Sequence, residues 1–587
     1  MQIKVNRNFF WSNVFVDQLV ECGVQYVCVS PGSRSTPLTY SISQNQKLKS
    51  FVIIDERSSG FFALGIAKKT KSPVLIVTTS GTATAELYPA IIEAYQNRVP
   101  LIIATADRPA YLRNSGSNQT INQDNLYKNH IRFFYDAGIP NLKVDALKSF
   151  KKNILAAHRI CSIDNIGPIH FNLPFEKPLE PNSFDTTIDE SIIKNALPDS
   201  FSKSDRKNIF STKNLEKLNQ LLKKNCCGVI TVGPGNFSES FVTKLERFSA
   251  KFALPIFADA SSGLAFKPNR ITNLITNFEA IIRSEKTQGL FSPKVNIHFG
   301  RTATSNKLEE FLSKTNCKKF IVNRFGDMFD SSKKSIIVKQ EEEAFLDRYI
   351  DSNFEFRDKA LKSLNNLKQI DNEVEKIKAS SLISLEKFNE PAILLKIIEA
   401  IPPNSNLMIG NSIPIRDLDF FASSVSKNIS VYQNRGASGI DGVTSTALGI
   451  CSQSKNPTYL VIGDLSYYYD INSLLIAKQF KIPLIIILIN NNGGSIFRFL
   501  PISDYKNVFE KYFLTPTHLS FKKITEAFDI DYKELKNYKD ILNHLKVSSV
   551  RKTAVVYEIK TNSEYSLNLR KKYWKKVDTF VQNFEVI

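Results

Sequence analysis

The amino-acid sequence predicts an α/β protein of three domains, each built on a parallel β-sheet. Its 587 residues are far more than one hydrophobic core usually holds. Hydrophobic residues make up 42% of the chain and charged residues 23%, which is typical of folded globular proteins. Short apolar runs alternate with helix-like segments, and this alternation indicates parallel sheets that are covered by helices on both faces.

The first domain is expected over residues 1–185. Its predicted strands are the apolar runs Tyr26–Ser30, Phe51–Ile54, Val74–Thr78 and Leu101–Ala104, and its predicted helices include Glu56–Lys69 and Ala83–Tyr95. In parallel sheets, ligands bind at the carboxyl ends of the strands. The residues that directly follow each run are therefore candidates for a functional site.

The second domain is expected over residues 186–380, after a loop rich in proline, asparagine and aspartate. Its predicted strands are Gly228–Val232, Val295–Phe299 and Phe320–Val322, and the charge-rich segment Asp347–Lys387 is expected to be a helix and a connector. Gly233-Pro234-Gly235 follows the first of these strands. Without a clearly placed acidic partner it is a weak dinucleotide fingerprint, so we expect a Rossmann-like domain that binds no dinucleotide.

Composition and charge exclude several classes of protein. The longest apolar run, Ile482–Ile489, has eight residues, whereas a membrane helix needs about 20. The N-terminus lacks the apolar segment of a signal peptide, so a cytoplasmic protein without a membrane span is expected. The seven cysteines form no C-x-x-C pair, which argues against a disulfide framework or a zinc site.

The net charge of +20 raises the question of a nucleic-acid partner. However, the lysines are spread along the chain and form no single basic arm. Biased codon usage explains the charge best, anionic small-molecule substrates are the second explanation, and no nucleic-acid partner is expected.

The third domain is expected over residues 381–587, and its most informative stretch predicts a strand, a helix and a second strand over Tyr459–Ile462, Tyr468–Phe480 and Leu484–Ile489. Asp464 follows the first strand, and Asn491 follows the second, 27 residues later. Because adjacent parallel strands end side by side, their side-chain oxygens would converge with the carbonyls of Asn492-Gly493-Gly494. Such hard oxygen ligands suit Mg²⁺. An ordinary turn in which Asp464 caps a helix explains these residues equally well.

This stretch resembles the signature of thiamine-diphosphate enzymes, GD followed about 27 residues later by NN. Leu465 replaces the usual third glycine, a departure shared by the 2-succinyl-5-enolpyruvyl-6-hydroxy-3-cyclohexene-1-carboxylate synthases of menaquinone and phylloquinone biosynthesis. Further stretches similar to that family occur in its order, at Ser30–Leu38, Asp55–Ala67, Thr78–Ala94, Ala106–Pro109, Asn118–Thr120, Gly410–Asp419 and Asn434–Gly442. They span both outer domains, whereas the middle domain matches mainly through His298–Arg301.

The resemblance implies three domains of the thiamine-diphosphate-enzyme type. The first would bind the pyrimidine of the cofactor, the second would be Rossmann-like, and the third would bind the diphosphate and the metal. Asp464, Asn491 and the backbone carbonyl of Gly493 would hold Mg²⁺, or Mn²⁺, on the diphosphate.

The resemblance also gives Glu56 the catalytic role. A carboxylate beside N1′ of the aminopyrimidine favours the imino tautomer, whose 4′-nitrogen removes the C2 proton of the thiazolium ring, while the protein supplies geometry and electrostatics. Ile440 would lie between the two cofactor rings, and Ile496 and Phe497 would wall the thiazolium side. On local grounds alone, Glu56 is a first-turn helix acid and Ile440 is a core residue.

Five arginines lie in loops after predicted strands or within the family stretches: Arg34, Arg108, Arg301, Arg416 and Arg435. A guanidinium group binds a carboxylate at two points. The resemblance implies two dicarboxylate substrates, 2-oxoglutarate and isochorismate, which several arginines would hold. Ser33, Gln119 and Ser412 belong to the same stretches and would hydrogen-bond the substrates, although solvated surface residues are the alternative for each.

The implied reaction is decarboxylation of 2-oxoglutarate and 1,4-addition of the resulting succinic semialdehyde carbanion to isochorismate. In this family the glutamate and the metal site come from different subunits, so a homodimer or a dimer of dimers is implied, with active sites at the subunit interface. An acetolactate-synthase-like carboligase that carries FAD is the nearest alternative. A nucleic-acid-binding protein and an inactive scaffold of the same fold are the others.

Overall fold

The structure, a computed structural model, describes residues 2–202, 212–223, 227–268, 271–351, 358–383 and 387–585. The chain divides into two compact units. The first unit comprises Met1–Arg206, Asn434–Lys455 and Ser466–Leu484, and the second comprises Lys207–Gln433, Asn456–Leu465 and Ile485–Ile587. The predicted boundary between the second and third domains, at residues 380 and 381, stays a prediction. The helix and connector predicted over Asp347–Lys387 include residues 352–357 and 384–386, which lie outside the described residues.

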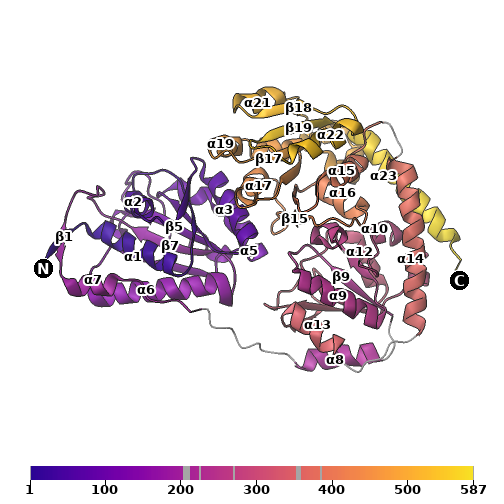
Figure 1. Cartoon of the computed structure of the whole chain (residues 1–587), viewed down its shortest axis with the longest axis horizontal. Helices are drawn as coiled ribbons and strands as arrows, with labels where there is room; N and C mark the ends of the chain where they lie inside the picture. Colours follow the sequence, from indigo (N-terminus) through magenta and orange to yellow (C-terminus); the bar gives the residue numbers. More distant parts are fainter. Residues whose placement is uncertain are drawn as a thin grey trace. The chain divides into compact units, whose positions relative to one another are not determined.

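The first unit is built on a six-stranded parallel sheet in the order β3-β2-β4-β5-β7-β6. Its strands are Tyr26–Val29 (β2), Lys49–Val52 (β3), Val74–Thr78 (β4), Leu101–Asp107 (β5), Phe133–Asp136 (β6) and Ile169–Pro174 (β7). Helices α1 (Arg7–Glu21) and α6 (Val144–Arg159) pack together beside the sheet (Figure 1). Trp11 of α1 stacks on Phe150 of α6 at 4.0 Å between ring centroids, so aromatic contacts hold this layer of the core together.

Helices α3 (Glu56–Thr70) and α17 (Val443–Ser452) cross closely within the first unit. A Cβ atom on Gly65 would lie 2.1 Å from the carbonyl oxygen of Thr446, and one on Gly449 would lie 2.1 Å from that of Phe62. Real Cβ atoms do not approach this closely, so the crossing requires glycine on both helices.

We expect Gly449→Ala to lower the free energy of unfolding by about 3 kcal/mol, the upper end of the usual cost of overpacking, because backbone atoms on both sides resist movement. Urea unfolding followed by circular dichroism measures the change. Gly289→Ala is the matched control, since a Cβ atom there meets nothing within 4 Å. Equal midpoints for the two variants would contradict the close crossing of α3 and α17.

The second unit contains two parallel sheets, in the orders β10-β9-β11-β12-β13 and β15-β14-β16-β17-β19-β18. The first has strands Gly228–Val232 (β9), Ile256–Ala258 (β10), Val295–Phe299 (β11), Lys318–Asn323 (β12) and Ile336–Lys339 (β13). The second has strands Asn406–Ile409 (β14), Ser430–Tyr432 (β15), Thr458–Gly463 (β16), Leu484–Asn490 (β17), Asp531–Glu534 (β18) and Val555–Lys560 (β19). Over the described residues the chain forms three parallel sheets, and these confirm the predicted α/β fold class.

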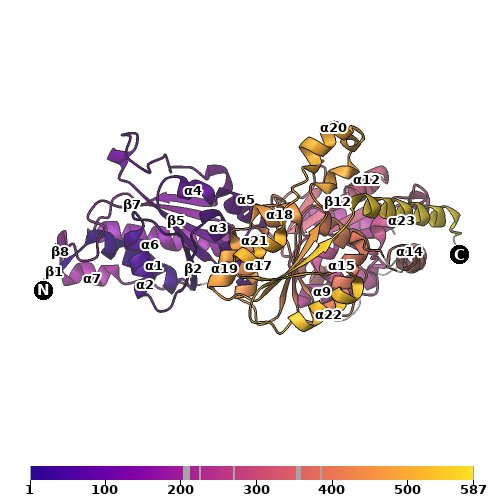
Figure 2. The same ribbon diagram turned by 90° about the horizontal axis from the view of Figure 1, so that it is seen from above.

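Helices cover the sheets of the second unit. Helix α15 (Glu390–Ala400) packs against α22 (Tyr538–Ser548), and Figure 2 shows both beside the C-terminal sheet. The long helix α23 (Ser563–Asn583) contacts α14 (Asp358–Lys378) and α15. No helix among the described residues is long and apolar enough to cross a membrane.

In each of these parallel sheets, one strand is followed along the chain by a neighbour on one side and then by a neighbour on the other side. These switches in strand order lie between β2 and β4, between β9 and β11, and between β14 and β16. At such a switch point the loops after the two strands diverge and leave a crevice at the carboxyl edge, where ligands bind. In the first sheet these loops touch, because a Cβ atom on Gly32 would lie 2.3 Å from the Cβ of Thr79. The fold therefore positions three candidate loop pairs.

Several predicted elements have other bounds in the structure. The strand predicted over Phe51–Ile54 begins and ends earlier, at Lys49–Val52 (β3), because the chain turns at Asp55, whose side chain accepts from the amide of Ser58 at 3.2 Å and caps α3. The helix predicted over Ala83–Tyr95 is divided into Thr82–Glu86 (α4) and Tyr88–Asn97 (α5), because Pro89 cannot donate to a helical hydrogen bond.

The helix predicted over Tyr468–Phe480 is also two helices, Asp464–Tyr469 (α18) and Ser473–Gln479 (α19). The break lies at Asp470, a fully buried carboxylate that accepts from the backbone amide and the hydroxyl of Ser445, at 2.6 and 2.9 Å. Burial raises the pKa of Asp470 to about 6. Ser445 and Asp470 lie far apart in the sequence, so the local pattern of the predicted helix does not reveal this contact.

Candidate active site

The predicted metal ligands lie at the carboxyl ends of two neighbouring strands of the C-terminal sheet. Asp464 directly follows β16, and Asn491 directly follows β17. The carboxylate of Asp464 accepts a hydrogen bond from the amide of Gly493 at 2.7 Å, which ties the two loops together. Asp464 is only 2% exposed, and this burial, with a smaller contribution from Glu390, raises its pKa to about 6. A nearby cation would offset the cost of burying this charge.

The amide of Asn491 has one satisfied end and one unsatisfied end. Its Nδ2 donates to Oε1 of Glu390 at 2.9 Å. Its Oδ1 is buried and has no hydrogen-bond partner. Because buried polar atoms are nearly always bonded, this oxygen is an acceptor open to a hydrogen-bond donor or a cation.

The turn after Asn491 has a backbone that only glycine allows. Gly493 has φ 131°, and a Cβ atom there would lie 2.1 Å from the carbonyl oxygen of Leu514. The carbonyl of Gly493 accepts from the amide of Ser495 at 2.8 Å and keeps a second lone pair. The carboxylate, the orphaned amide oxygen and this carbonyl fit a hard divalent cation. The described residues hold no cluster of three His, Cys, Asp or Glu side chains suited to a metal, and this site needs only one carboxylate.

Glu56 is the first residue of α3 and is half-buried. Burial raises its pKa, and the charges of Asp55 and Glu86 add to this effect. A carboxyl group whose pKa is raised holds and returns a proton more readily near neutral pH. The first-turn position expected from the sequence therefore coexists with an environment suited to proton sharing.

The three predicted apolar contacts to the cofactor lie in two loops. Ile440 lies in the loop before α17 in the first unit, where its carbonyl accepts from the hydroxyl of Ser466 at 2.7 Å. Ile496 and Phe497 lie in the short 3-10 helix Ser495–Phe499 of the second unit, and all three are half-buried. Half-burial leaves part of each side chain accessible to a ligand.

Arg34, in the loop after β2, and Arg108, directly after β5, form a positively charged pair at the carboxyl edge of the first sheet. Burial, and then the charge of Arg108, lower the pKa of Arg34, so the two guanidinium groups act on each other. Arg34 donates to the carbonyl of Phe175 at 2.9 Å, and Arg108 donates to that of Gln119 at 2.7 Å and to the hydroxyl of Ser80. The charge of Asp107 offsets part of the repulsion between the two guanidinium groups, and an anionic ligand would offset it further. Ser33, beside Arg34, and Gln119 are exposed.

Arg416 and Ser412 lie at the corresponding place in the C-terminal sheet, on and before helix α16 (Ile413–Phe421). Arg416 donates to the carbonyl of Ser412 at 2.8 Å. Ser412 itself has φ 72°, a left-handed conformation that costs about 1–3 kcal/mol in a residue other than glycine and is found mainly at functional sites. The α16 loop is therefore held in a strained form next to the candidate metal ligands.

Arg301 and Arg435 lie elsewhere. Arg301 follows β11, and its guanidinium lies 5.2 Å from the ring centroid of Phe329. Its carbonyl would lie 1.8 Å from a Cβ atom on Gly233, so the close approach of these loops is a structural reason for the Gly233-Pro234-Gly235 turn. Arg435, in the first unit, is half-buried. The next two amides, of Gly436 and Ala437, donate to the carboxylate of Glu93 at 3.0 and 2.7 Å.

The structure thus groups the predicted residues in two sets. The first unit holds Ser33, Arg34, Glu56, Arg108, Gln119, Arg435 and Ile440, and the second holds Arg301, Ser412, Arg416, Asp464, Asn491, Gly493, Ile496 and Phe497. Sequence reasoning missed the carboxylates that support these loops, Glu93 and Glu390. Glu93 lies within a stretch that was noted for its similarity to the family, but Glu390 has no local signal.

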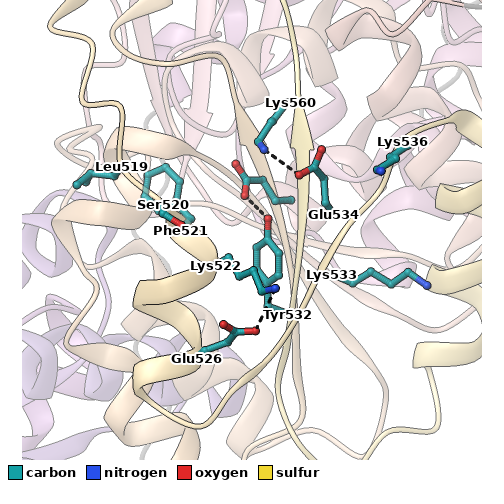
Figure 3. Close-up of a pocket in the computed structure, with 11 residues that line it drawn as sticks. Leu519, Ser520, Phe521, Lys522, Glu526, Tyr532, Lys533, Glu534, Lys536 and Lys560 are labelled. Carbon is teal, nitrogen blue, oxygen red and sulfur yellow. Dashed lines mark hydrogen bonds and ion pairs between the residues drawn. The ribbon is translucent and has the colours of Figure 1, made fainter.

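A hollow of about 470 Å³ lies beside β18 in the second unit (Figure 3). Two ion pairs lie among its lining side chains, Lys560 with Glu534 at 2.8 Å and Lys522 with Glu526 at 3.9 Å. The hydroxyl of Tyr532 donates to the buried carboxylate of Glu558. None of the predicted site residues lines this hollow.

Comparison with known proteins gives two family models and many relatives. The model described as thiamine pyrophosphate enzyme, N-terminal TPP binding domain, matches residues 11–126, and the corresponding C-terminal TPP binding domain matches residues 424–559. The chain is 34% identical to a 2-succinyl-5-enolpyruvyl-6-hydroxy-3-cyclohexene-1-carboxylate synthase of Listeria innocua, over 96% of this chain and 97% of that protein. Proteins of the same name from Microcystis aeruginosa and Haloquadratum walsbyi are 33% and 32% identical, over 96% and 97% of this chain and 98% of each relative.

Proposed function

We propose, since the chain belongs to the 2-succinyl-5-enolpyruvyl-6-hydroxy-3-cyclohexene-1-carboxylate synthase family, that it catalyses the reaction for which its relatives are named. It would decarboxylate 2-oxoglutarate and add the succinic semialdehyde carbanion to isochorismate in a 1,4-addition, with release of CO2. The observation that carries the proposal is the similarity to proteins of this name over nearly the whole chain. An acetolactate-synthase-like carboligase, the alternative, would share the cofactor, whereas the relatives reported above carry the name of the synthase.

Thiamine diphosphate, when bound, supplies the carbanion chemistry. In our proposal, Glu56 shares a proton with N1′ of the pyrimidine, and its raised pKa supports this role. Ile440 would lie between the two rings of the cofactor, and Ile496 and Phe497 would wall its thiazolium side.

Asp464, Asn491 and the carbonyl of Gly493 would hold Mg²⁺ or Mn²⁺ against the diphosphate. The buried carboxylate and the orphaned Oδ1 of Asn491 support this assignment. We also propose that the protein acts as a homodimer or a dimer of dimers, because one cofactor must meet Glu56 and the metal ligands together and the family draws these from two subunits. The predicted cytoplasmic location and the domain roles stay part of the proposal.

The arginines would bind the substrate carboxylates. Loss of one arginine–carboxylate contact in a partly desolvated site costs roughly 2–5 kcal/mol, which is about 30- to 3000-fold in kcat/KM. We therefore expect Arg34→Ala and Arg416→Ala each to lose activity on that scale while still binding thiamine diphosphate. Steady-state kinetics with each substrate varied in turn measures the loss. Changes below threefold for both substrates would identify the two arginines as solvated surface residues.

A comparison of donors tests the proposed function against the alternative. We expect the purified protein to release CO2 from 2-oxoglutarate in the presence of isochorismate, to do so poorly from pyruvate, and to be colourless. Acetolactate formation from pyruvate by a yellow, flavin-containing protein would favour the acetolactate-synthase-like reading instead.

A further inference from the structure

A fully buried ion cluster lies behind the candidate metal ligands of the second unit. Arg570 of α23, Glu390 in the first turn of α15 and Asp417 of α16 are 1%, 1% and 3% exposed. Arg570 donates to Oε2 of Glu390 at 2.7 Å, and to both oxygens of Asp417, at 2.9 Å from its Nε. One guanidinium group therefore holds two carboxylates from two different helices.

The second oxygen of Glu390 faces the candidate metal site. Oε1 accepts from Nδ2 of Asn491 at 2.9 Å and from the hydroxyl of Thr561 at 3.0 Å. An ionised carboxylate only accepts hydrogen bonds, so it can face the NH2 end of an amide but not the oxygen end. Oε2 of Glu390 accepts from Arg570 and Oε1 accepts from Thr561. Both oxygens of Glu390 therefore act as acceptors, so the NH2 end of Asn491 faces Glu390 and the Oδ1 of Asn491 points away from it.

This orientation decides whether Asn491 is able to bind a cation. The two ends of an asparagine amide have nearly the same shape, so packing alone does not choose between them. With the amide turned over, its NH2 group would meet the cation and repel it. Glu390 accepts from the NH2 end of Asn491, which leaves the Oδ1 of Asn491 without a hydrogen-bond partner.

We propose that Glu390, held by Arg570, is a positioning residue that turns the Oδ1 of Asn491 toward the metal. The proposal rests on the metal role that we propose for Asn491. Residues that orient a metal ligand typically change metal affinity 10- to 100-fold when they are replaced.

Glu390→Gln tests the proposal with little change of shape. The donors of Arg570 would take the carbonyl of the new glutamine, which leaves its NH2 group against Asn491 and favours the wrong amide orientation. Asp417→Asn is the matched control, because it removes the other carboxylate charge from Arg570 without touching Asn491. Both variants lose one charge of the same buried cluster, so we expect similar losses of thermal stability.

The readout is Mn²⁺ binding, measured by electron paramagnetic resonance, to the full-length protein with thiamine diphosphate. We expect the Kd for Mn²⁺ to rise about 10- to 100-fold in Glu390→Gln and less than threefold in Asp417→Asn. In a protein that already carries Asn491→Ala, we expect Glu390→Gln to change the Kd for Mn²⁺ no further, because Glu390 acts through Asn491. Additive losses in the double variant would mean that the two residues act independently.

The outcomes distinguish a failure of the positioning role of Glu390 from a failure of the proposed metal site. Wild-type Mn²⁺ affinity in Glu390→Gln, or equal losses in Glu390→Gln and Asp417→Asn, would overturn the positioning role and leave the metal site intact. Absence of Mn²⁺ binding by the wild-type protein with thiamine diphosphate would overturn the metal site and, with it, the role of Glu390. If Glu390→Gln does not fold, Thr561→Val leaves the Asn491 contact in place, and a loss of affinity in that variant as large as 10-fold would contradict the account.

Discussion

Glu56→Gln should lower kcat by about 100- to 10,000-fold, the usual contribution of a positioned acid or base, while the protein still folds and binds thiamine diphosphate. Glutamine keeps the size of the side chain and a hydrogen-bond acceptor but cannot share a proton with N1′ of the pyrimidine. The measurement is the rate of deuterium exchange at C2 of the bound cofactor, together with kcat. Exchange is the sharper of the two readouts, because it needs neither substrate.

Glu86→Gln is the matched control for this variant. Glu86 is an exposed carboxylate whose charge acts on Glu56, so its replacement makes the same chemical change nearby without removing the proposed proton acceptor. We expect an effect below threefold. Near-normal C2 exchange in Glu56→Gln would contradict the assignment of Glu56 and leave the family membership untouched.

Asp464→Ala should weaken metal-dependent binding of thiamine diphosphate by more than about 100-fold, because it removes the charged ligand itself, whereas loss of a supporting residue already costs 10- to 100-fold. Asn491→Ala should weaken it less, since it removes a neutral oxygen. Calorimetric titration of thiamine diphosphate with and without Mg²⁺ measures both losses.

Asp578→Ala on α23 serves as the control for the change of charge. It removes a carboxylate from the same unit, and we expect wild-type affinity for the cofactor. Should Asp464→Ala bind thiamine diphosphate as tightly as the wild type in Mg²⁺, the metal would have to be held by other residues.

The elements predicted best from the sequence are the buried strands. Val74–Thr78, Gly228–Val232 and Val295–Phe299 have the same bounds in the structure as in the prediction, because each is a short run, mostly apolar, that is buried on both faces of its sheet. The placement of Asp464 and Asn491 at the ends of neighbouring strands followed from the same pattern. Their roles as metal ligands, and that of Glu56 in catalysis, stay predictions that the experiments above test.

Features that depend on distant contacts were not predicted. The break at Asp470 arises from hydrogen bonds to Ser445, and nothing in the helical period reveals it. Glu390 and Arg570 are 180 residues apart, and neither belongs to a motif. Tertiary contacts of this kind override local propensity, so they become visible only when the sheets and helices are assembled.

The central claim, that this chain is a thiamine-diphosphate-dependent synthase acting on 2-oxoglutarate and isochorismate, is tested most directly by the consumption of isochorismate. The purified protein would be incubated with isochorismate, 2-oxoglutarate, thiamine diphosphate and Mg²⁺, with each component omitted in turn, while CO2 is measured in parallel. The account predicts that isochorismate disappears only in the complete mixture, with one CO2 released for each molecule consumed. Unchanged isochorismate in the complete mixture, or consumption that continues without 2-oxoglutarate, would contradict it.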